Sequence, residues 1–278
     1  MHYRVAKFDE TALAVPRAYA NHARGFSRHT LIDRALGSVH MEAGICQLED
    51  GGSIDACRHA FETGIYVLEG DLEVFREDAA FRVSAHDYVL LDYGCVHGLR
   101  NAGGKRARWF EMQAPQPKVA NAWQDTHFVA SAPWPQHIEH WPGANPPHRA
   151  VGRFQAIDAL SPRGDGVQQG LSVFRFMEQR FGARSFFMMR GDLAPGGFRS
   201  RHDHPIEEFY FALSGAAYMD IEDERFQLRP GDAAWTGVGT SHAFTHCGTE
   251  PFQWIETQAP QFPVHYGTRN YAQWERSR

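Results

Sequence analysis

The sequence predicts an all-β protein built from two consecutive β-barrels. Short stretches rich in β-branched and aromatic residues alternate with Gly, Pro and Asp turns, a rhythm typical of barrels and sandwiches. The chain also repeats itself, because residues of the first half recur in the second half at a constant offset of 145 positions, as Gly70 and Gly215 illustrate. A long repeat in a single register indicates two copies of one structural unit.

Each copy contains a series of short candidate strands separated by turn residues. In the first copy, residues 25–116, they are Gly64–Leu68, Leu72–Phe75, Phe81–Val83 and Tyr88–Leu91. In the second copy, residues 170–261, the equivalent runs are Phe209–Leu213, Ala217–Ile221, Phe226–Leu228 and Ala233–Thr236. We therefore expect both copies to form the same type of barrel.

The repeat divides the chain into an N-terminal barrel at residues 1–117, a connector at 118–168 and a C-terminal barrel at 169–278. The connector is rich in Pro and Trp, and prolines disfavour a central strand. We therefore expect it to pack across the two barrels. Three tryptophans are the expected anchors of that packing: Trp123, Trp134 and Trp141.

The composition argues against several classes of protein. The formal net charge of −5 does not suggest a nucleic-acid partner, and no apolar run approaches the roughly 18–20 residues of a membrane span. The N-terminus lacks the charged-then-apolar build of a secretory signal, and the four cysteines form no C-x-x-C pair. We expect a cytoplasmic protein with reduced thiols that shelters its sheet edges in a homo-oligomer such as a dimer.

Three potential metal ligands lie close together in the second copy: His202, His204 and Glu208. On one extended strand these positions share a face, because alternate side chains point the same way. His242 follows a Gly-rich turn that can fold a second strand against the first. Three imidazoles and one carboxylate suit a divalent transition metal, with Mn or Fe expected and Ni, Co or Zn as alternatives. Solvated surface histidines are the other interpretation, which the tight spacing disfavours.

These residues stand in two motifs that resemble those of the cupin superfamily. The first motif, G-x5-H-x-H-x3-E-x6-G, is matched at Gly196, His202, His204, Glu208 and Gly215. The second, G-x5-P-x-G-x2-H-x3-N, is matched at Gly231, Gly239 and His242, with Gly237 and His246 in place of the proline and the asparagine. The resemblance extends to both copies and implies a bicupin, with two tandem double-stranded β-helix (jelly-roll) barrels.

The first copy departs from the cupin pattern where a metal would bind. Cys57, His59 and His97 stand at the three His positions, and Thr63 stands at the Glu position. Loss of the carboxylate lowers the affinity for hard divalent ions, so we expect a degenerate barrel that is kept for packing. A soft metal site at the cysteine and the two histidines is the alternative. Glu62 can replace the missing carboxylate only if the strand bulges.

Within the bicupins, the chain resembles ureidoglycine aminohydrolase, an enzyme of purine-ureide breakdown. The resemblance rests on the chain length, on the string E-T-x2-Y-V-x2-G at residues 62–70 and on a metal site in the second half. It implies a manganese site with Glu, His, His and Gln ligands. Only His204 agrees with that set in kind and place, whereas His202, Glu208 and His242 stand where other ligand types are expected.

Two further residues are candidates for catalytic roles. A six-coordinate metal with four protein ligands keeps two positions open for substrate, water or dioxygen. Tyr210 shares the parity of Glu208, so it is a candidate to point into the barrel and hydrogen-bond a substrate, with core packing as the alternative. His246 is four residues beyond His242 and is a candidate acid or base near neutral pH, or else a polar residue at a strand end.

Three functions from different classes fit this sequence, each with a small molecule as partner. The first, which we favour narrowly, is a metal-dependent oxidoreductase of the cupin dioxygenase type that acts on a small polar metabolite. The second is a manganese-dependent aminohydrolase of a ureide-like compound. The third is a non-catalytic binding or storage protein, in which aromatic side chains plug the barrel mouth. Candidates for such plugs are Phe198, Phe209, Phe211, Trp235, Phe244 and Trp254.

Overall fold

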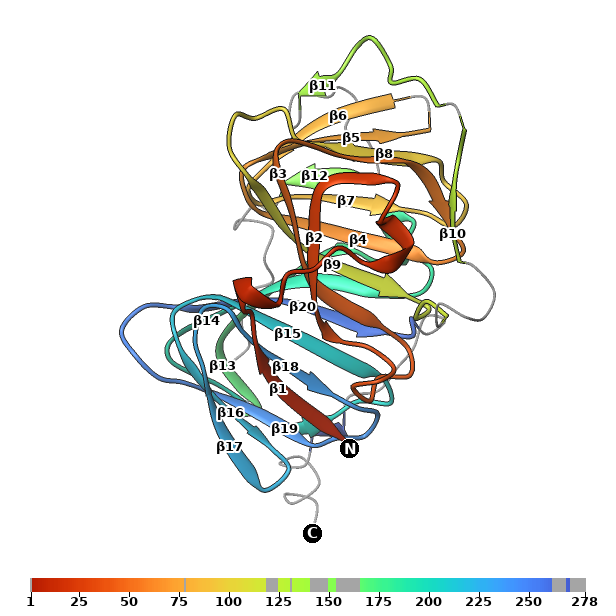
Figure 1. Cartoon of the computed structure of the whole chain (residues 1–278). Coiled ribbons are helices and arrows are strands. Elements are labelled where there is room, and N and C mark those ends of the chain that lie inside the picture. The colour runs from red at the N-terminus through yellow and green to blue at the C-terminus, as the bar shows by residue number, and fades with distance from the viewer. Residues whose placement is uncertain are drawn as a thin grey trace.

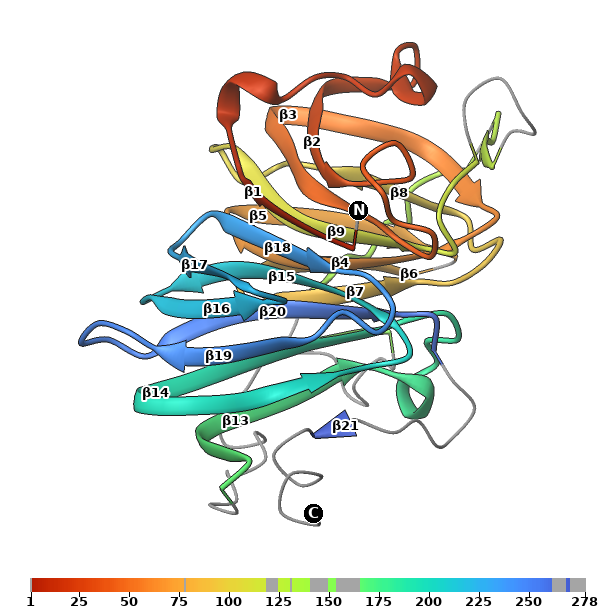
Figure 2. The ribbon, with the colours of Figure 1, turned by 90° about the horizontal axis from the view of Figure 1, so that it is seen from below.

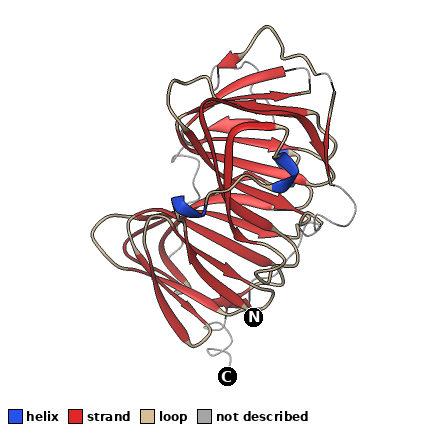
Figure 3. Cartoon of the chain, in the orientation of Figure 1, coloured by secondary structure: helices blue, strands red, loops and turns tan. Residues whose placement is uncertain are grey.

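The protein consists of two β-barrels that pack side by side (Figure 1), which confirms the predicted fold class. The computed structural model describes residues 2–77, 79–118, 125–130, 132–140, 150–153, 166–261 and 269–270. Most of these residues form strands. The helical segments among them are short 3-10 turns, namely η1 (Glu10–Ala12), η2 (Arg17–Tyr19) and η4 (Gln179–Phe181). Figure 3 shows the first two in blue. No helix in the described ranges has the length and apolar character needed to cross a membrane.

The N-terminal barrel is an 11-stranded sheet with the order β11-β6-β5-β8-β3-β9-β4-β7-β12, and β2 and β10 also pair with β3. The strands of the first repeat are β2 (Ala23–Ile32), β3 (Glu42–His59), β4 (Glu62–Glu69), β5 (Asp71–Arg76), β6 (Ala79–Ser84), β7 (Asp87–Leu91), β8 (His97–Arg100) and β9 (Ala107–Ala114). The connector adds β10 (Thr126–Phe128), β11 (Glu139–His140) and β12 (Val151–Arg153).

The C-terminal barrel is a 10-stranded sheet with the order β1-β18-β15-β20-β14-β19-β16-β17, and β13 and β21 also pair with β14. Its strands are β1 (Tyr3–Lys7), β13 (Gln168–Met177), β14 (Phe187–Asp203), β15 (Glu207–Ser214), β16 (Ala217–Ile221), β17 (Glu224–Leu228), β18 (Asp232–Thr236), β19 (His242–His246), β20 (Phe252–Ala259) and β21 (Arg269–Asn270).

The first strand of the chain does not belong to the barrel that follows it in sequence. Strand β1 pairs antiparallel with β18, with Tyr3 opposite Thr236 and Lys7 opposite Asp232. The first strand of the predicted N-terminal unit, residues 1–117, is therefore part of the C-terminal sheet. The physical reason is that β1 covers the free edge of β18, and the hydrogen bonds of an edge strand can be made by any segment within reach.

In the part of the connector that the structure describes, the strands join the sheet of the N-terminal barrel, and Ala150 also enters the apolar cluster between the two barrels. Strand β10 pairs with β3, β11 with β6 and β12 with β7. The indole of Trp134 lies 5.7 Å from the ring of Phe75 and under the guanidinium of Arg100. Trp123 and Trp141 lie outside the described residues.

Strand β15 shows how the alternation of side chains builds two cores at once. Tyr210 and Ala212 point into the C-terminal barrel, where they join its interior cluster with Leu193. Phe209 and Phe211 have the opposite parity and belong to the cluster that joins the two barrels. A strand buried on both faces reads as a continuous run of apolar residues, and the run FYFAL at residues 209–213 has that character.

Figure 2 shows the strands of the two barrels lying side by side, and a large apolar cluster fills the interface between them. Phe110 of the N-terminal barrel stacks on Phe209 and Phe211, with ring centroids 5.8 and 6.0 Å apart. Gly64 permits the close approach, because a Cβ atom there would lie 2.9 Å from the ring of Phe186. The two barrels therefore share an apolar cluster at their interface, in addition to the cluster inside each barrel.

Candidate metal centre

Three histidines of the C-terminal barrel lie close together inside it, two of them at the end of β14 and the third at the start of β19. His202 is near the end of β14, His204 follows that strand, and His242 begins β19. Strand β14 pairs with β19 so that His202 lies directly opposite His242. One ligand nitrogen from each ring lies within 4.8 Å of the others. The second strand predicted to return His242 to the site is therefore present.

The expectation that His202, His204 and Glu208 project from a single strand is wrong. Strand β14 ends at Asp203, and β15 begins at Glu207, so the chain turns between the second histidine and the glutamate. Pro205 lies in that turn, where its missing N–H group interrupts the ladder. The turn still places Glu208 beside the histidines. Glu207, the residue before it, points away from them, as the alternation of side chains along a strand predicts.

The Glu208 carboxylate lies among the imidazoles. Its Oε1 is 3.2 Å from Nε2 of His204, and its Oε2 is 3.0 Å from Nε2 of His242. The four side chains that the sequence singled out are all buried, with exposed fractions from 0% for His242 to 7% for His204. Such separations are those between neighbouring ligands of one metal ion, because bonds of about 2.1 Å that meet near a right angle place the donor atoms about 3 Å apart.

Backbone carbonyl groups set the orientation of two of the rings. Nδ1 of His202 donates to the carbonyl of Ser200 at 2.7 Å, and Nδ1 of His242 donates to the carbonyl of Thr240 at 3.0 Å. Because Nδ1 carries the proton in both rings, each Nε2 offers its lone pair to the centre of the cluster. This arrangement is the one that metal-binding histidines adopt, so the donor set fits a divalent cation.

The charges of the site agree with that fit. Burial alone would raise the pKa of the Glu208 carboxyl, but the neighbouring imidazoles of His204 and His242 outweigh it and lower the pKa to about 2. Burial lowers the pKa of His202 and His204, although Glu208 partly opposes it at His204. Burial also disfavours the charged form of His242, yet the contact with Glu208 raises its pKa. A buried anion beside imidazole nitrogens is a favourable environment for a cation.

A second group of polar side chains holds the Glu208 carboxylate in place. Nε2 of Gln258 donates to Glu208 at 2.8 Å and to Glu256 at 2.7 Å, and the indole N–H of Trp254 donates to Glu256 at 3.0 Å. Burial and the charge of Glu208 raise the pKa of Glu256 to about 7. Neither sequence motif includes Gln258, so its role was not predicted. The repeat contained a signal for Gln258. Gln113 stands at the equivalent position of the first copy and donates the equivalent hydrogen bond, to Glu111 at 2.9 Å.

The two candidate catalytic residues lie in different surroundings. The hydroxyl of Tyr210 is 3.1 Å from Nε2 of His242, inside the cluster. His246 is at the other end of β19, where its Nε2 is 2.8 Å from the carbonyl oxygen of Glu250. The structure thus brings Tyr210 together with the metal-ligand candidates and leaves His246 bound to a loop carbonyl, the strand-end position that was its alternative interpretation.

The aromatic residues considered as plugs of the barrel mouth are mostly core residues. Three of them face the other barrel, namely Phe209, Phe211 and Trp235. Phe244 and Trp254 stack on each other in the interior of the C-terminal barrel, with their centroids 5.6 Å apart. Their burial is accounted for by packing.

The residues of the N-terminal barrel that are equivalent to the three histidines also lie close together inside their barrel. Cys57, His59 and His97 are buried, and their ligand atoms lie within 4.8 Å of one another. Thr63 takes the place of Glu208, and its buried hydroxyl has no hydrogen-bond partner among the described residues. Glu62 does not replace the missing carboxylate, because it accepts hydrogen bonds from residues 184–185 of the other barrel.

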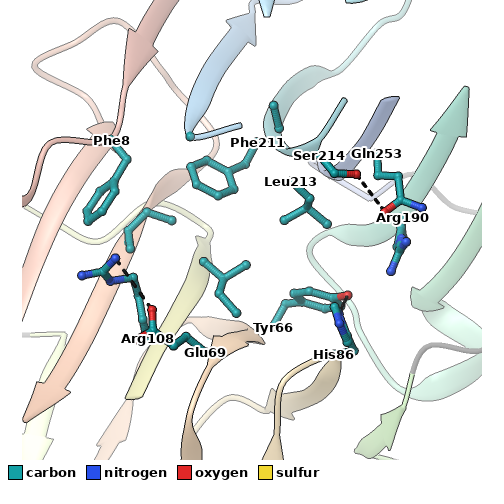
Figure 4. Close-up of a pocket in the computed structure, with 14 residues that line it drawn as sticks. Phe8, Tyr66, Glu69, His86, Arg108, Arg190, Phe211, Leu213, Ser214 and Gln253 are labelled. Atoms are coloured by element: carbon teal, nitrogen blue, oxygen red, sulfur yellow. Dashed lines mark hydrogen bonds and ion pairs between the residues drawn. The ribbon is translucent and has the colours of Figure 1, made fainter. Parts of the chain in front are cut away.

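A cavity of about 330 Å³ lies between the barrels and is separate from both clusters (Figure 4). Tyr66, His86 and Arg108 line it from the N-terminal barrel, and Arg190 and Phe211 line it from the C-terminal barrel. Its guanidinium groups already have partners, because Arg108 donates to Gln47 at 2.6 Å and Arg190 donates to Asp192 at 3.3 Å. None of the residues in either cluster lines this cavity.

Comparison with known proteins identifies the barrels. A family model described as "Cupin domain" matches the chain twice, at residues 44–112 and 189–257. A curated relative, polyketide synthase CurC of Streptomyces cyaneus, is 31% identical over 83 residues, which are 30% of this chain and 54% of the relative. The match thus spans about half the length of that relative.

Solved structures share the whole fold. An oxalate decarboxylase of Bacillus subtilis superimposes with a TM-score of 0.70 at 16% identity, over 97% of this chain and 80% of that chain. The enzyme of the same name from Lactobacillus farciminis gives 0.69 at 14% identity, over 99% and 90% of the two chains. Protein Ylba of E. coli gives 0.66 at 16% identity, over 95% and 93%. At these identities the likeness establishes the fold.

Proposed function

Because the chain belongs to the cupin proteins and carries two cupin domains in tandem, we propose that it is a metal-dependent enzyme of the dioxygenase type that oxidises a small, oxygen-rich organic metabolite in its C-terminal barrel. One observation carries this proposal. The Glu208 carboxylate is buried within 3.2 Å of one imidazole nitrogen and 3.0 Å of another, in a cluster completed by a third imidazole.

The residues that would hold the metal are His202, His204, Glu208 and His242. Iron or manganese held there would supply a redox-active Lewis acid for the reaction of dioxygen with an oxygen-bearing substrate. With three neutral imidazoles and one carboxylate, the ligand set neutralises only one of the two positive charges of a divalent ion. The site therefore favours an anionic substrate such as a carboxylate or an enolate.

The surrounding residues prepare the site for this chemistry. Gln258 fixes the Glu208 carboxylate by donating a hydrogen bond at 2.8 Å. Burial and the Glu208 charge raise the pKa of Tyr210 well above its usual value, so the phenol keeps its proton and can donate it in a hydrogen bond to an anionic oxygen in the cluster. The deep burial of the ligands limits the access of bulk water, which protects reactive oxygen chemistry from side reactions.

The hydrolytic alternative finds less support in the arrangement of carboxyl groups. A hydrolase must activate water, either with a placed base or with a metal ion. Glu208 is enclosed by imidazoles, and Glu256 is engaged by Trp254 and Gln258. Because both carboxyls already have partners, hydrolysis here would depend on the metal to activate water, and we favour oxygen chemistry.

The test is an oxygen-electrode screen of the purified protein reconstituted with Fe²⁺ or Mn²⁺ under anaerobic conditions. The panel contains small keto acids, hydroxy acids, diketones and ureides, with ammonia measured in parallel. We expect oxygen uptake with at least one oxygen-rich acid or diketone, lost in Glu208→Gln and kept in Glu250→Gln, a matched exposed glutamate of the same barrel. Ammonia release without oxygen uptake would assign the aminohydrolase reaction instead, and binding without turnover would assign a binding protein.

A further inference from the structure

We propose that the N-terminal barrel holds a second metal centre of a different kind, a zinc site formed by Cys57, His59 and His97. The three residues come from the end of β3 and the start of β8, and β3 pairs with β8 so that Cys57 lies opposite His97. This register matches that of His202 and His242 in the other barrel. In each barrel the same strand pairing therefore brings three potential ligands together. They are three imidazoles in the C-terminal barrel, and one thiol with two imidazoles in the N-terminal barrel.

The separations between the ligand atoms are those of a tetrahedral zinc site. Sγ of Cys57 is 4.0 Å from Nε2 of His59 and 3.5 Å from Nε2 of His97, and the two nitrogens are 3.1 Å apart. Around a tetrahedral zinc ion with Zn–S and Zn–N bonds of about 2.3 and 2.05 Å, the expected separations are about 3.6 Å for S–N and about 3.3 Å for N–N. Side chains this close need only a small adjustment to bind one ion.

Hydrogen bonds at the far side of each ring direct the free nitrogens inward. Nδ1 of His97 donates to the carbonyl of Cys95 at 3.0 Å, which leaves the lone pair on Nε2 facing Cys57. Nδ1 of His59 is 3.1 Å from the hydroxyl of Thr126, a residue of the short strand β10 that lies beside β3. Zinc-bound histidines are held in this way by a partner on the other ring nitrogen.

Hydrogen bonding without an ion leaves the thiol of Cys57 without an acceptor of its own among these three residues. His97 offers one lone pair at Nε2, and both the thiol of Cys57 and an Nε2 proton of His59 would compete for it. The alternative tautomer of His59 places two lone pairs face to face at 3.1 Å. A cation that binds the thiolate and both Nε2 lone pairs gives all three side chains a partner at once.

The substitutions between the copies explain why this site would select zinc. Cys57 replaces a histidine, and Thr63 replaces the glutamate that the C-terminal site uses. A thiolate with two imidazoles suits zinc, whereas Mn²⁺ prefers carboxylate and other oxygen ligands. With three protein ligands the fourth position is left to solvent, and the unpaired buried hydroxyl of Thr63 can hydrogen-bond a water bound there.

The first experiment measures zinc in a chain whose C-terminal cluster is weakened. The full chain carrying Glu208→Gln and His204→Ala, which removes two ligand candidates of the C-terminal cluster, is stripped of metal and dialysed against Zn²⁺ or Mn²⁺, and its metal content is determined by mass spectrometry. We expect one equivalent of zinc per chain and less than about a tenth of that amount of manganese. A chain that retains no zinc overturns the proposal.

Replacement of zinc by Co²⁺ tests the thiolate directly. We expect a sulfur-to-cobalt charge-transfer absorption in the near ultraviolet, abolished in Cys57→Ser and unchanged in Cys95→Ser, a matched buried thiol of the same barrel that lies outside the cluster. Circular dichroism verifies that each variant is folded. The absence of this band in the parent chain, or its survival in a folded Cys57→Ser variant, contradicts the assignment. The parent spectrum decides the question even if Cys57→Ser does not fold.

Discussion

Glu62 and Glu207 hold the same position in the two barrels, and the carboxylate of each binds the backbone of the opposite barrel. Glu207 accepts hydrogen bonds from the N–H groups of residues 39–40 at 2.7 and 3.0 Å. Glu62 accepts hydrogen bonds from the N–H groups of residues 184–185, the shortest at 2.6 Å. The two donor pairs are related by the same offset of 145 residues as the two glutamates. Each barrel therefore completes the hydrogen bonding of its neighbour.

This exchange predicts a large effect of Glu207→Ala on stability. The substitution leaves the buried hydroxyl of Ser38 and two part-buried backbone N–H groups without their acceptor. An unsatisfied buried donor costs about 1–3 kcal/mol, so we expect the free energy of unfolding to fall by about 2–4 kcal/mol in urea denaturation. Glu250→Ala, on the exposed surface, is the control and should change it by less than about 0.5 kcal/mol. Equal values for the two variants would contradict the structural role of Glu207.

The metal centre predicts that Glu208→Gln loses its cation while the barrel stays folded. The amide keeps the volume and the contact with Gln258 but removes the negative charge that faces His204 and His242. Loss of a group that merely supports a ligand reduces metal affinity about 10–100-fold, so loss of the ligand itself should exceed about 100-fold. Isothermal titration of the metal-free protein with Mn²⁺ and Fe²⁺ measures this. Unaltered affinity would show that the cation binds elsewhere.

The buried carboxyl of Glu256 predicts a pH dependence of stability. Its pKa is raised from 4.5 to about 7 by burial and by Glu208. Between these values the folded chain binds more protons than the unfolded chain, so stability falls as the pH rises from about 4.5 to about 7. The loss amounts to about 3 kcal/mol for this group, from the free energy per unit of pKa.

The variant Glu256→Gln isolates that contribution, because the amide imitates the protonated acid. Urea denaturation of the metal-free protein at several pH values between 4.5 and 8 should give a stability difference between variant and parent that grows in favour of the variant as the pH rises. A difference that does not change with pH would mean that Glu256 titrates normally in the folded state.

The close approach of the barrels predicts that Gly64→Ala destabilises the protein. An added Cβ would lie 2.9 Å from the ring of Phe186 and 2.7 Å from the terminal methyl of Met188. Overpacking of a dense core costs about 1–3 kcal/mol, which thermal denaturation detects as a lower Tm. Gly103→Ala, in an exposed loop with its nearest contact at 3.2 Å, is the control. If both variants melt at the temperature of the parent, the interface has more room than the structure indicates.

The repeat allowed the fold to be predicted, because it reflects local patterns that occur twice in one register. Strand β16 occupies the predicted residues Ala217–Ile221, and β15 contains the predicted run Phe209–Leu213. No local pattern in the residues of β1 predicts its pairing with β18. An edge strand is chosen by what lies beside it in space, and the alternation of side chains along β1 does not identify its partner.

The sequence by itself determined the types of ligand in each barrel, since imidazole, carboxylate and thiol groups stand at matched positions of a repeat whose turns are marked by glycines. Only the tertiary structure decided how they meet. A turn separates His204 from Glu208, where a single strand was expected. Gln258 contacts the Glu208 carboxylate, and Glu62 and Glu207 each bind the opposite barrel. The physical reason is that residue spacing fixes which face of one strand a side chain occupies, whereas convergence of ligands depends on contacts between strands far apart in the chain.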